Sequence, residues 1–124
     1  MKNFVLILSI FVIAIWSCRD CAVSSITTVQ NLNNGVMVVS YLGDCGATVD
    51  MDANVSVCMT NDDLQNLGNR TGNVFFAYHA RGVTVTKVSP DTVKIIYAAS
   101  EVRTMRYYVN GVNFVYEENW KYFH

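Results

Sequence analysis

The hydrophobic positions of this chain fall into two patterns. Residues 4–16, FVLILSIFVIAIW, form one apolar block that a single serine interrupts. Downstream, short stretches rich in β-branched and aromatic residues alternate with turn residues at intervals of roughly 8 to 12 positions. The first pattern is typical of a targeting segment, and the second is typical of an all-β domain.

Eight strands are predicted in the β-rich part. They span 25–31, 36–42, 54–59, 73–80, 83–89, 93–99, 102–109 and 112–119. Glycine, proline and asparagine place the turns between them at 33–35, 81–82, 89–91 and 110–111. One helical turn is expected within 60–67, because Thr60 and Asp63 can form a capping box and Gly68 can end the turn.

The last two predicted strands form the most definite pair. A type I′ turn at Asn110 and Gly111 pairs Val109 with Val112, because both turn residues tolerate positive φ. Stepping outward pairs Tyr107 with Phe114, Met105 with Tyr116, and Arg103 with Glu118. One face of this hairpin is apolar and the other is mixed, which predicts a half-buried antiparallel pair.

Together the strands predict a small antiparallel β-sandwich. The length of 124 residues suits one domain, and no repeat or linker divides the β-rich part. The leading architecture is the immunoglobulin-like class, by analogy of fold class. The usual Cys…Trp…Cys pattern is not met, because Cys45 and Cys58 are close in sequence and Trp120 lies far beyond both.

The apolar block predicts export. It follows Lys2, and a helix of its length rises about 20 Å, less than the bilayer core of roughly 30 Å. Residues 1–17 are therefore interpreted as a signal peptide, which leaves 18–124 as a single secreted domain. We expect this domain outside the cell or in the lumen of the endoplasmic reticulum, with no stable membrane span. An uncleaved anchor and a lipid-modified Cys18 are the competing interpretations.

Cysteines and sequons fit the same compartment. The four cysteines, Cys18, Cys21, Cys45 and Cys58, predict two bracing disulfides whose connectivity stays open. A redox pair at Cys18 and Cys21 is the competing interpretation, although the surrounding sequence shows no βαβ context. Asn54 and Asn69 each begin a glycosylation sequon, and both are expected at solvated positions.

Charge and histidine content argue against several function classes. Nine basic and ten acidic residues give a net charge of −1, which lacks the basic footprint of a nucleic-acid-binding protein. A catalytic assembly would have to use His79, because His124 is the last residue, and no nucleophile motif accompanies it. Residues 50–54 begin like an EF-hand but lack its glycine, so a polar loop is predicted there. We expect no enzyme, no cofactor and no metal site.

Aromatic residues crowd the C-terminal fifth of the chain. Arg106 and Tyr108 fall on the mixed face of the predicted hairpin, and Trp120, Tyr122 and Phe123 follow it. Because tyrosine, tryptophan and arginine are enriched at interface hot spots, these five residues are the predicted interaction surface. A core strand pair with a tail packed over the end of the sandwich would also account for them. Exposed edge strands offer a second route to partners, including a homodimer.

These features favour a secreted, non-catalytic glycoprotein that acts by protein–protein recognition. In layout the chain is similar to small secreted accessory glycoproteins of some animal viruses, which combine a signal peptide with a disulfide-braced β-sandwich. That likeness implies modulation of host immunity as a second candidate function. A self-associating structural or surface protein is a third candidate, and a small secreted hydrolase that uses His79 is a fourth.

Overall fold

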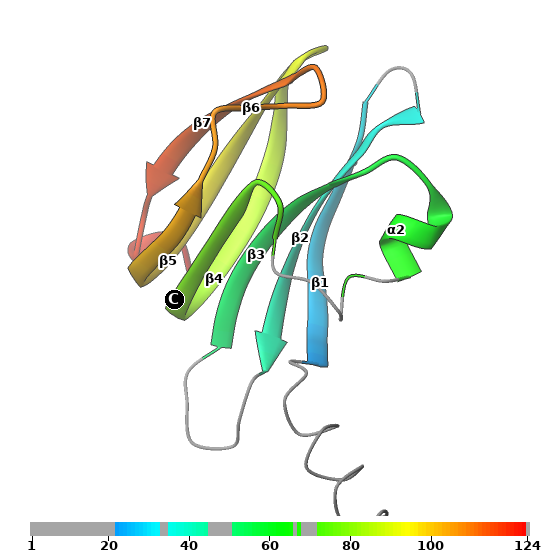
Figure 1. Cartoon of the computed structure of the whole chain (residues 1–124). Coiled ribbons are helices and arrows are strands. Elements are labelled where there is room, and N and C mark those ends of the chain that lie inside the picture. Colours follow the sequence, from blue (N-terminus) through cyan, green and yellow to red (C-terminus); the bar gives the residue numbers. More distant parts are fainter. Residues whose placement is uncertain (1–21, 33–34, 45–50, 66, 68–71, 124) are drawn as a thin grey trace, which may run out of the picture.

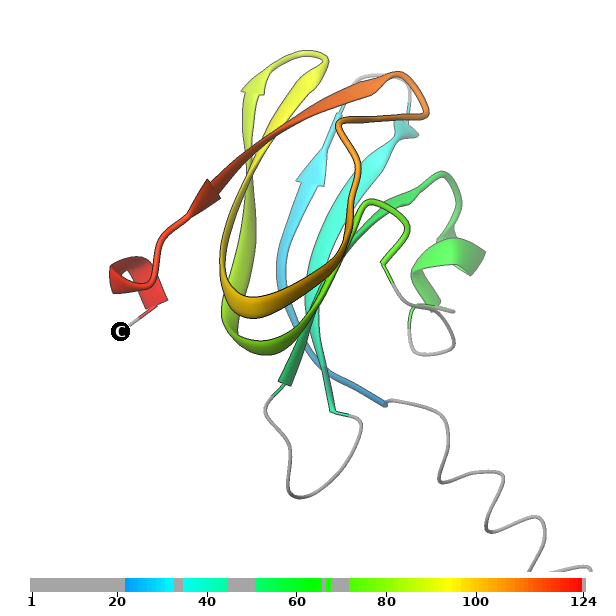
Figure 2. The ribbon, with the colours of Figure 1, turned by 60° about the vertical axis from the view of Figure 1, so that its left-hand side comes forward.

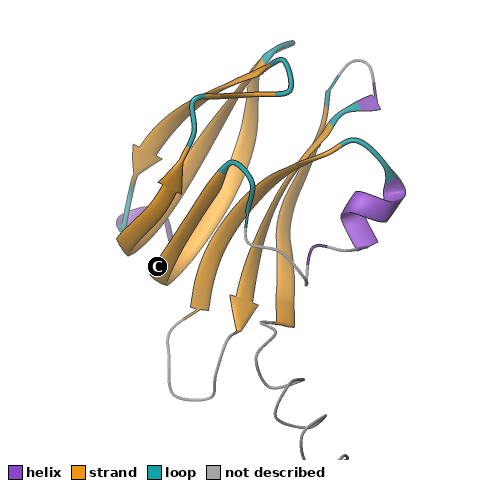
Figure 3. Ribbon diagram, viewed as in Figure 1, coloured by secondary structure: helices purple, strands orange, loops and turns teal. Residues whose placement is uncertain are grey.

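The computed structural model describes residues 22–32, 35–44, 51–65, 67 and 72–123 (Figure 1). Strands make up most of this part of the chain, with only short helical segments (Figure 3). The all-β prediction is therefore confirmed. The expected signal peptide at 1–17 and the cysteines Cys18, Cys21 and Cys45 lie outside the described residues.

Among the described residues, seven strands form one sheet in the order β1-β2-β3-β4-β5-β7-β6. The strands are β1 (Ala22–Asn31), β2 (Met37–Asp44), β3 (Met51–Cys58), β4 (Phe75–Ser89), β5 (Thr92–Met105), β6 (Tyr108–Val109) and β7 (Val112–Glu118). Strands β1 to β5 pair antiparallel in chain order, whereas β5 and β7 run parallel. A helix, α2 (Asn61–Gln65), follows β3, and a 3-10 helix, η3 (Lys121–Phe123), follows β7.

Strand β4 runs straight through the turn that was predicted at 81–82, so that prediction is wrong. Ala80 pairs with Ala99 and Gly82 pairs with Ala98, which leaves one extra residue in β4. His79, just before this bulge, has a positive φ of 54°. The two strands predicted on either side of residues 81–82 are therefore one strand, which bends at a bulge.

Strands β4 and β5 bend together at this bulge, and the sheet folds over on itself (Figure 2). Strand β3 begins at Met51, which pairs with Ala80, so the second half of β4 has no partner in β3. Both halves of the folded sheet send apolar side chains into one core. Its members include Val38, Val55, Phe75, Val85, Ile95 and Phe114.

Side-chain hydroxyls join β1 to the second half of β4, although these strands are not neighbours in the sheet order. Thr27 Oγ1 donates to the Val83 carbonyl oxygen at 2.6 Å. Thr28 Oγ1 accepts a hydrogen bond from the Val85 N–H at 2.9 Å. The fully buried Ser40 hydroxyl hydrogen-bonds to both threonine hydroxyls. The hydroxyl groups thus satisfy backbone groups that no strand partner reaches.

The tip of the predicted C-terminal hairpin is confirmed. Val109 pairs with Val112, and Tyr108 pairs with Asn113. Asn110 and Gly111 have φ angles of 51° and 83°, as a type I′ turn requires.

The predicted register extends one step beyond this tip, where the Phe114 N–H donates to the Tyr107 carbonyl oxygen at 2.9 Å. From Met105 and Tyr116 outward the predicted register is wrong. Met105 pairs with Phe75 of β4, and Tyr116 pairs with Ile95 of β5. Strand β7 instead runs parallel to the start of β5, where Lys94 Nζ lies 3.0 Å from Glu117 Oε1. This arrangement keeps the apolar face of β7 on the core while β5 stays bonded to β4 along its whole length.

The connection between β3 and β4 covers the outer face of β2 and β3. The predicted capping box is confirmed, because the Asp63 N–H donates to Thr60 Oγ1 at 3.2 Å and Asp63 Oδ2 accepts from the Thr60 N–H at 3.3 Å. Leu67, after the helix, packs with Val39, Tyr41 and Cys58 in a second, smaller apolar cluster.

Candidate interaction surfaces

The two most exposed aromatic side chains of the described residues lie next to each other at β6. Tyr107 is 63% exposed and Tyr108 is 65% exposed. Arg106, directly before them, is also exposed. The predicted residues Arg106 and Tyr108 therefore lie together at the surface, and the sequence reasoning missed Tyr107 because it assigned that residue to the buried face.

The backbone beneath these tyrosines is fixed from two sides. The Arg106 N–H donates to the Val74 carbonyl oxygen at 2.9 Å. The Tyr116 hydroxyl donates to the Arg106 carbonyl oxygen, and the Tyr107 ring lies edge-on against the Tyr116 ring at 5.3 Å between centroids. Burial raises the pKa of the Tyr116 hydroxyl well above its ordinary value. We call residues 106–108, which these contacts hold in place, the tyrosine hairpin.

The C-terminal tail packs on the outside of the bend. The Asn119 N–H donates to the Tyr97 carbonyl oxygen at 2.8 Å and starts the tail beside β5. A Cβ atom at Gly82 would lie 2.2 Å from Cδ1 of Phe123, so the phenylalanine ring occupies the space that this glycine leaves. Trp120 and Tyr122 remain 42% and 57% exposed. The half-buried Phe123 is therefore a packing residue.

The five predicted surface residues do not form one patch. Arg106 and Tyr108 lie before β7, whereas the tail begins after it, and the seven residues of β7 span about 20 Å. In Figure 2, η3 lies at one end of β7 and the Asn110–Gly111 turn at the other. The chain thus presents two separate aromatic sites.

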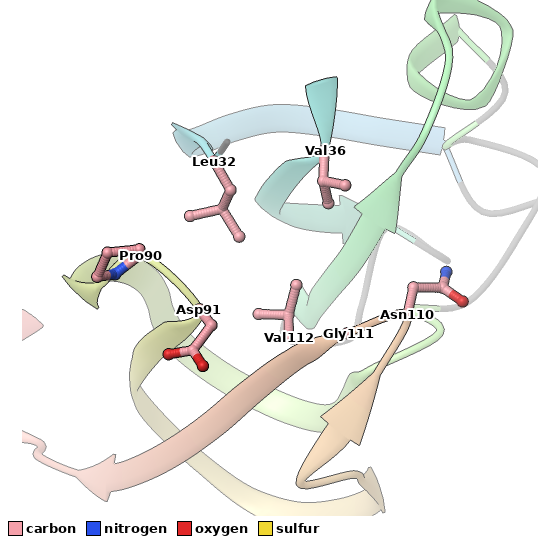
Figure 4. A pocket seen from close by; sticks show the side chains of 7 residues that line it. All are labelled: Leu32, Val36, Pro90, Asp91, Asn110, Gly111 and Val112. Atoms are coloured by element: carbon pink, nitrogen blue, oxygen red, sulfur yellow. The ribbon is translucent and has the colours of Figure 1, made fainter. Parts of the chain in front are cut away.

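Three turns meet around a hollow of about 260 Å³ (Figure 4). They are the β1–β2, β4–β5 and β6–β7 turns, and they contribute Leu32, Val36, Pro90, Asp91, Asn110, Gly111 and Val112. We call this site the three-turn hollow. The sequence marked all three turns, but no local pattern indicated that they converge.

The first sequon lies inside the fold. Asn54 is 4% exposed, and its Oδ1 accepts a hydrogen bond from the Gly72 N–H at 2.9 Å. Ser56, the hydroxyl residue of the sequon, accepts from the Asn73 N–H at 3.2 Å. The expected solvated position of Asn54 is therefore wrong, because β3 starts earlier than predicted and its outer face is covered. Asn69 lies outside the described residues.

The remaining candidate chemistry is limited. The polar loop expected at 50–54 is wrong from residue 51 onward, since these residues belong to β3 and Asp52 is buried. Cys58 is buried at the end of the same strand. His79 is exposed on the bulge. Within the described ranges, no group of three or more histidine, cysteine or acidic residues is arranged to hold a metal ion.

In the described part of the chain, no helix combines the length and apolar character that a membrane crossing requires.

Comparisons with protein-family models, with curated proteins and with solved structures find no match.

Proposed function

We propose that the chain is a secreted, non-catalytic glycoprotein that acts by protein–protein recognition through the tyrosine hairpin. The observation that carries this proposal is the combination of exposure and support at Tyr107 and Tyr108. Both rings face solvent, yet the backbone at Arg106 is hydrogen-bonded on both sides. Large amphipathic rings on a fixed backbone lose little conformational entropy when a partner covers them.

The energetic scale favours this site over the rest of the described surface. Burying a large aromatic side chain stabilises a complex by roughly 1.5–3 kcal/mol, and two adjacent rings form the centre of a hot spot. The neighbouring Arg106 adds a guanidinium group that can bind a carboxylate of the partner with two hydrogen bonds. A partner with an apolar patch next to an acidic residue fits this chemistry.

The finer architecture that we propose is a disulfide-braced β-sandwich made from one folded sheet. The shared core between the two halves of the sheet supports it. The consecutive order of β1 to β5 differs from the Greek-key order of immunoglobulin domains, so the immunoglobulin-like part of the proposal rests on face-to-face packing alone. We propose the bracing disulfides among Cys18, Cys21, Cys45 and Cys58, and the glycan at Asn69.

The test compares the two aromatic sites in one assay. The full chain is expressed in animal cells, and the purified product is fluorescently labelled and used to stain host cells, which the layout likeness makes the first candidates. We expect Arg106→Ala with Tyr108→Ala to reduce staining about tenfold or more. The matched control, Trp120→Ala with Tyr122→Ala, should stay close to wild type. Equal staining by wild type and the first double variant refutes the assignment of this surface.

Self-association through β7 is the second candidate function. Strand β7 pairs with β6 at Val112 and Asn113, and the Phe114 N–H donates to the Tyr107 carbonyl oxygen. Beyond Phe114 this edge has no strand neighbour among the described residues. Such an edge can pair with the same strand of a second copy. Light scattering should then detect a dimer at high concentration, and Glu118→Pro should return it to a monomer. A wild-type monomer at all concentrations excludes this candidate.

A further inference from the structure

Backbone hydrogen bonds hold several of the described residues that line the three-turn hollow. The Leu32 N–H donates to the Val36 carbonyl oxygen at 2.8 Å and closes the β1–β2 turn. The Asn113 N–H donates to the Asp91 carbonyl oxygen, also at 2.8 Å, and ties the β4–β5 turn to β7. A partner therefore does not have to order these described residues on binding.

The floor of the hollow is apolar. Leu32, Val36 and Val112 are 8%, 8% and 3% exposed and belong to the main core. Their side chains converge on the hollow in Figure 4, while Pro90 stands at its edge. An apolar side chain that enters here would extend the core outward by one residue.

One charged residue lines the hollow. The Asp91 carboxylate stands at its exposed rim, and Oδ1 accepts hydrogen bonds from the Ser89 and Thr92 hydroxyls at 2.9 and 3.1 Å. No described residue forms a salt bridge with Asp91. The rim thus holds a negative charge beside an apolar floor, and in Figure 4 the Asp91 carboxylate points away from Leu32 and Val36.

We propose that the three-turn hollow binds one large apolar side chain of a protein partner, and that a lysine or arginine next to that side chain meets Asp91. The volume supports a single side chain, because pockets for drug-sized ligands measure about 300–1,000 Å³. Charge complementarity with Asp91 is the reason that we expect a basic residue next to the apolar side chain of the partner. This inference rests on the proposed recognition function and adds a second contact site with a defined chemistry.

The test uses two capped peptides, acetyl-Gly-Trp-Lys-Gly-amide and acetyl-Gly-Trp-Glu-Gly-amide, and the isotope-labelled full chain as recovered from expressing cells. Methyl NMR should detect shifts of Leu32, Val36 and Val112 with the lysine peptide at millimolar concentration, the range that one buried side chain supports. The glutamate peptide should bind about twofold to fivefold more weakly. No methyl shift, or equal affinity for both peptides, overturns the proposal.

Two variants locate the effect. Asp91→Asn keeps an oxygen acceptor for Ser89 and Thr92, and it should remove the preference for the lysine peptide. Val36→Phe should fill the hollow and abolish binding of both peptides. If Val36→Phe does not fold, the two peptides on the wild-type chain still decide the matter. A preference that survives Asp91→Asn contradicts the role of the carboxylate.

Two further outcomes distinguish the hollow from the tyrosine hairpin and from self-association. The variant with Arg106→Ala and Tyr108→Ala should bind the lysine peptide as wild type does, so failure of the hollow and failure of the tyrosine hairpin remain distinguishable. If the peptide-free chain self-associates and the lysine peptide dissolves the assembly, the occupant is a second copy of this chain. That result overturns the assignment to a different protein.

Discussion

The outer face of β3 and the tyrosine hairpin both depart from the usual burial of side chains: a polar side chain is buried on β3, and large aromatic side chains are exposed at the hairpin. On β3 the polar Asn54 is 4% exposed, whereas Tyr108 on β6 is 65% exposed. Asn54 is tolerated inside because its carboxamide oxygen accepts the Gly72 N–H. Tyr108 has no such structural task, since β6 contributes only two residues to the sheet.

The comparison separates structural from functional exceptions to burial. A buried polar group that is fully hydrogen-bonded holds the fold together, and its loss leaves a partner unsatisfied. An exposed aromatic side chain on a fixed backbone contributes little to folding and remains available to a partner. Substitutions on β3 should therefore reduce stability, and substitutions at the tyrosine hairpin should reduce binding alone.

The largest expected effect is at Gly72, where the connection between β3 and β4 lies against the backbone of β3. A Cβ atom there would lie 2.2 Å from the Phe75 carbonyl oxygen and 2.7 Å from the Val55 nitrogen, and both are backbone atoms. Gly72→Ala should lower the free energy of unfolding by about 3 kcal/mol or more in urea titrations. Gly35→Ala is the control, because its Cβ would meet nothing within 4 Å and its positive φ costs only about 1 kcal/mol. Equal losses at both glycines would contradict the close crossing.

The next effect concerns the buried sequon. Asn54→Ala should lower the free energy of unfolding by about 1–3 kcal/mol, because the buried Gly72 N–H loses its acceptor. The exposed Asn113→Ala should change it by less than about 0.5 kcal/mol. Mass spectrometry after deglycosylation should assign no glycan to Asn54. A glycan at Asn54 would contradict the buried hydrogen bond to Gly72, because glycosylation requires the asparagine side chain in solvent.

The support of the tyrosine hairpin should have a smaller effect that depends on pH. Tyr116→Phe removes the hydroxyl that donates to Arg106 and should lower the free energy of unfolding by about 1 kcal/mol at neutral pH. The folded pKa of Tyr116 is raised above the ordinary value of 10.0, so the unfolded chain loses this proton first and wild-type stability falls as pH rises above 10.0.

Tyr116→Phe should therefore weaken the alkaline loss of stability, while the exposed Tyr108→Phe should keep it. Urea titrations at neutral and alkaline pH measure both variants. An unchanged alkaline slope in Tyr116→Phe would show that the anchoring hydroxyl is not buried as the structure has it.

The smallest effect tests the parallel placement of β7 that carries the tyrosine hairpin. Hydrogen bonds from Lys94 and Asn119 lower the pKa of Glu117, so this stabilisation is present above the ordinary carboxyl pKa and is lost as pH falls through the folded pKa. Lys94→Gln should raise the pKa of Glu117 in an NMR titration. Arg103→Gln, which breaks the ion pair with Glu101 and the contact of the guanidinium with the Tyr78 ring, should not. The reverse pattern would contradict the β5–β7 register.

Local features of the fold were predictable from the sequence. The Thr60–Asp63 capping box and the turn at Asn110 and Gly111 depend on residues close together in the chain. Most strand positions were likewise indicated by β-branched and aromatic residues, because a strand face needs only its own alternation of polar and apolar positions.

The long-range features were not predictable. Alternation indicates that Phe114 and Tyr116 face a core, but it does not say which strand lies beside them, so the parallel β5–β7 pair was missed. Gly82 is a residue type that favours turns, but it lies inside β4, where β5 continues to pair on both sides of it and the Phe123 ring occupies the space of its missing Cβ. The burial of Asn54 depends on Gly72, whose position is set by packing of the whole connection.

Quantitative affinity capture tests the central claim most directly. Tagged wild-type chain, the variant with Arg106→Ala and Tyr108→Ala, and the variant with Trp120→Ala and Tyr122→Ala are incubated with the same animal-cell extract. The captured proteins are compared by mass spectrometry. We predict a partner that wild type and the tail variant retain equally and that the hairpin variant loses about tenfold or more. Equal recovery by all three proteins would contradict recognition through the tyrosine hairpin.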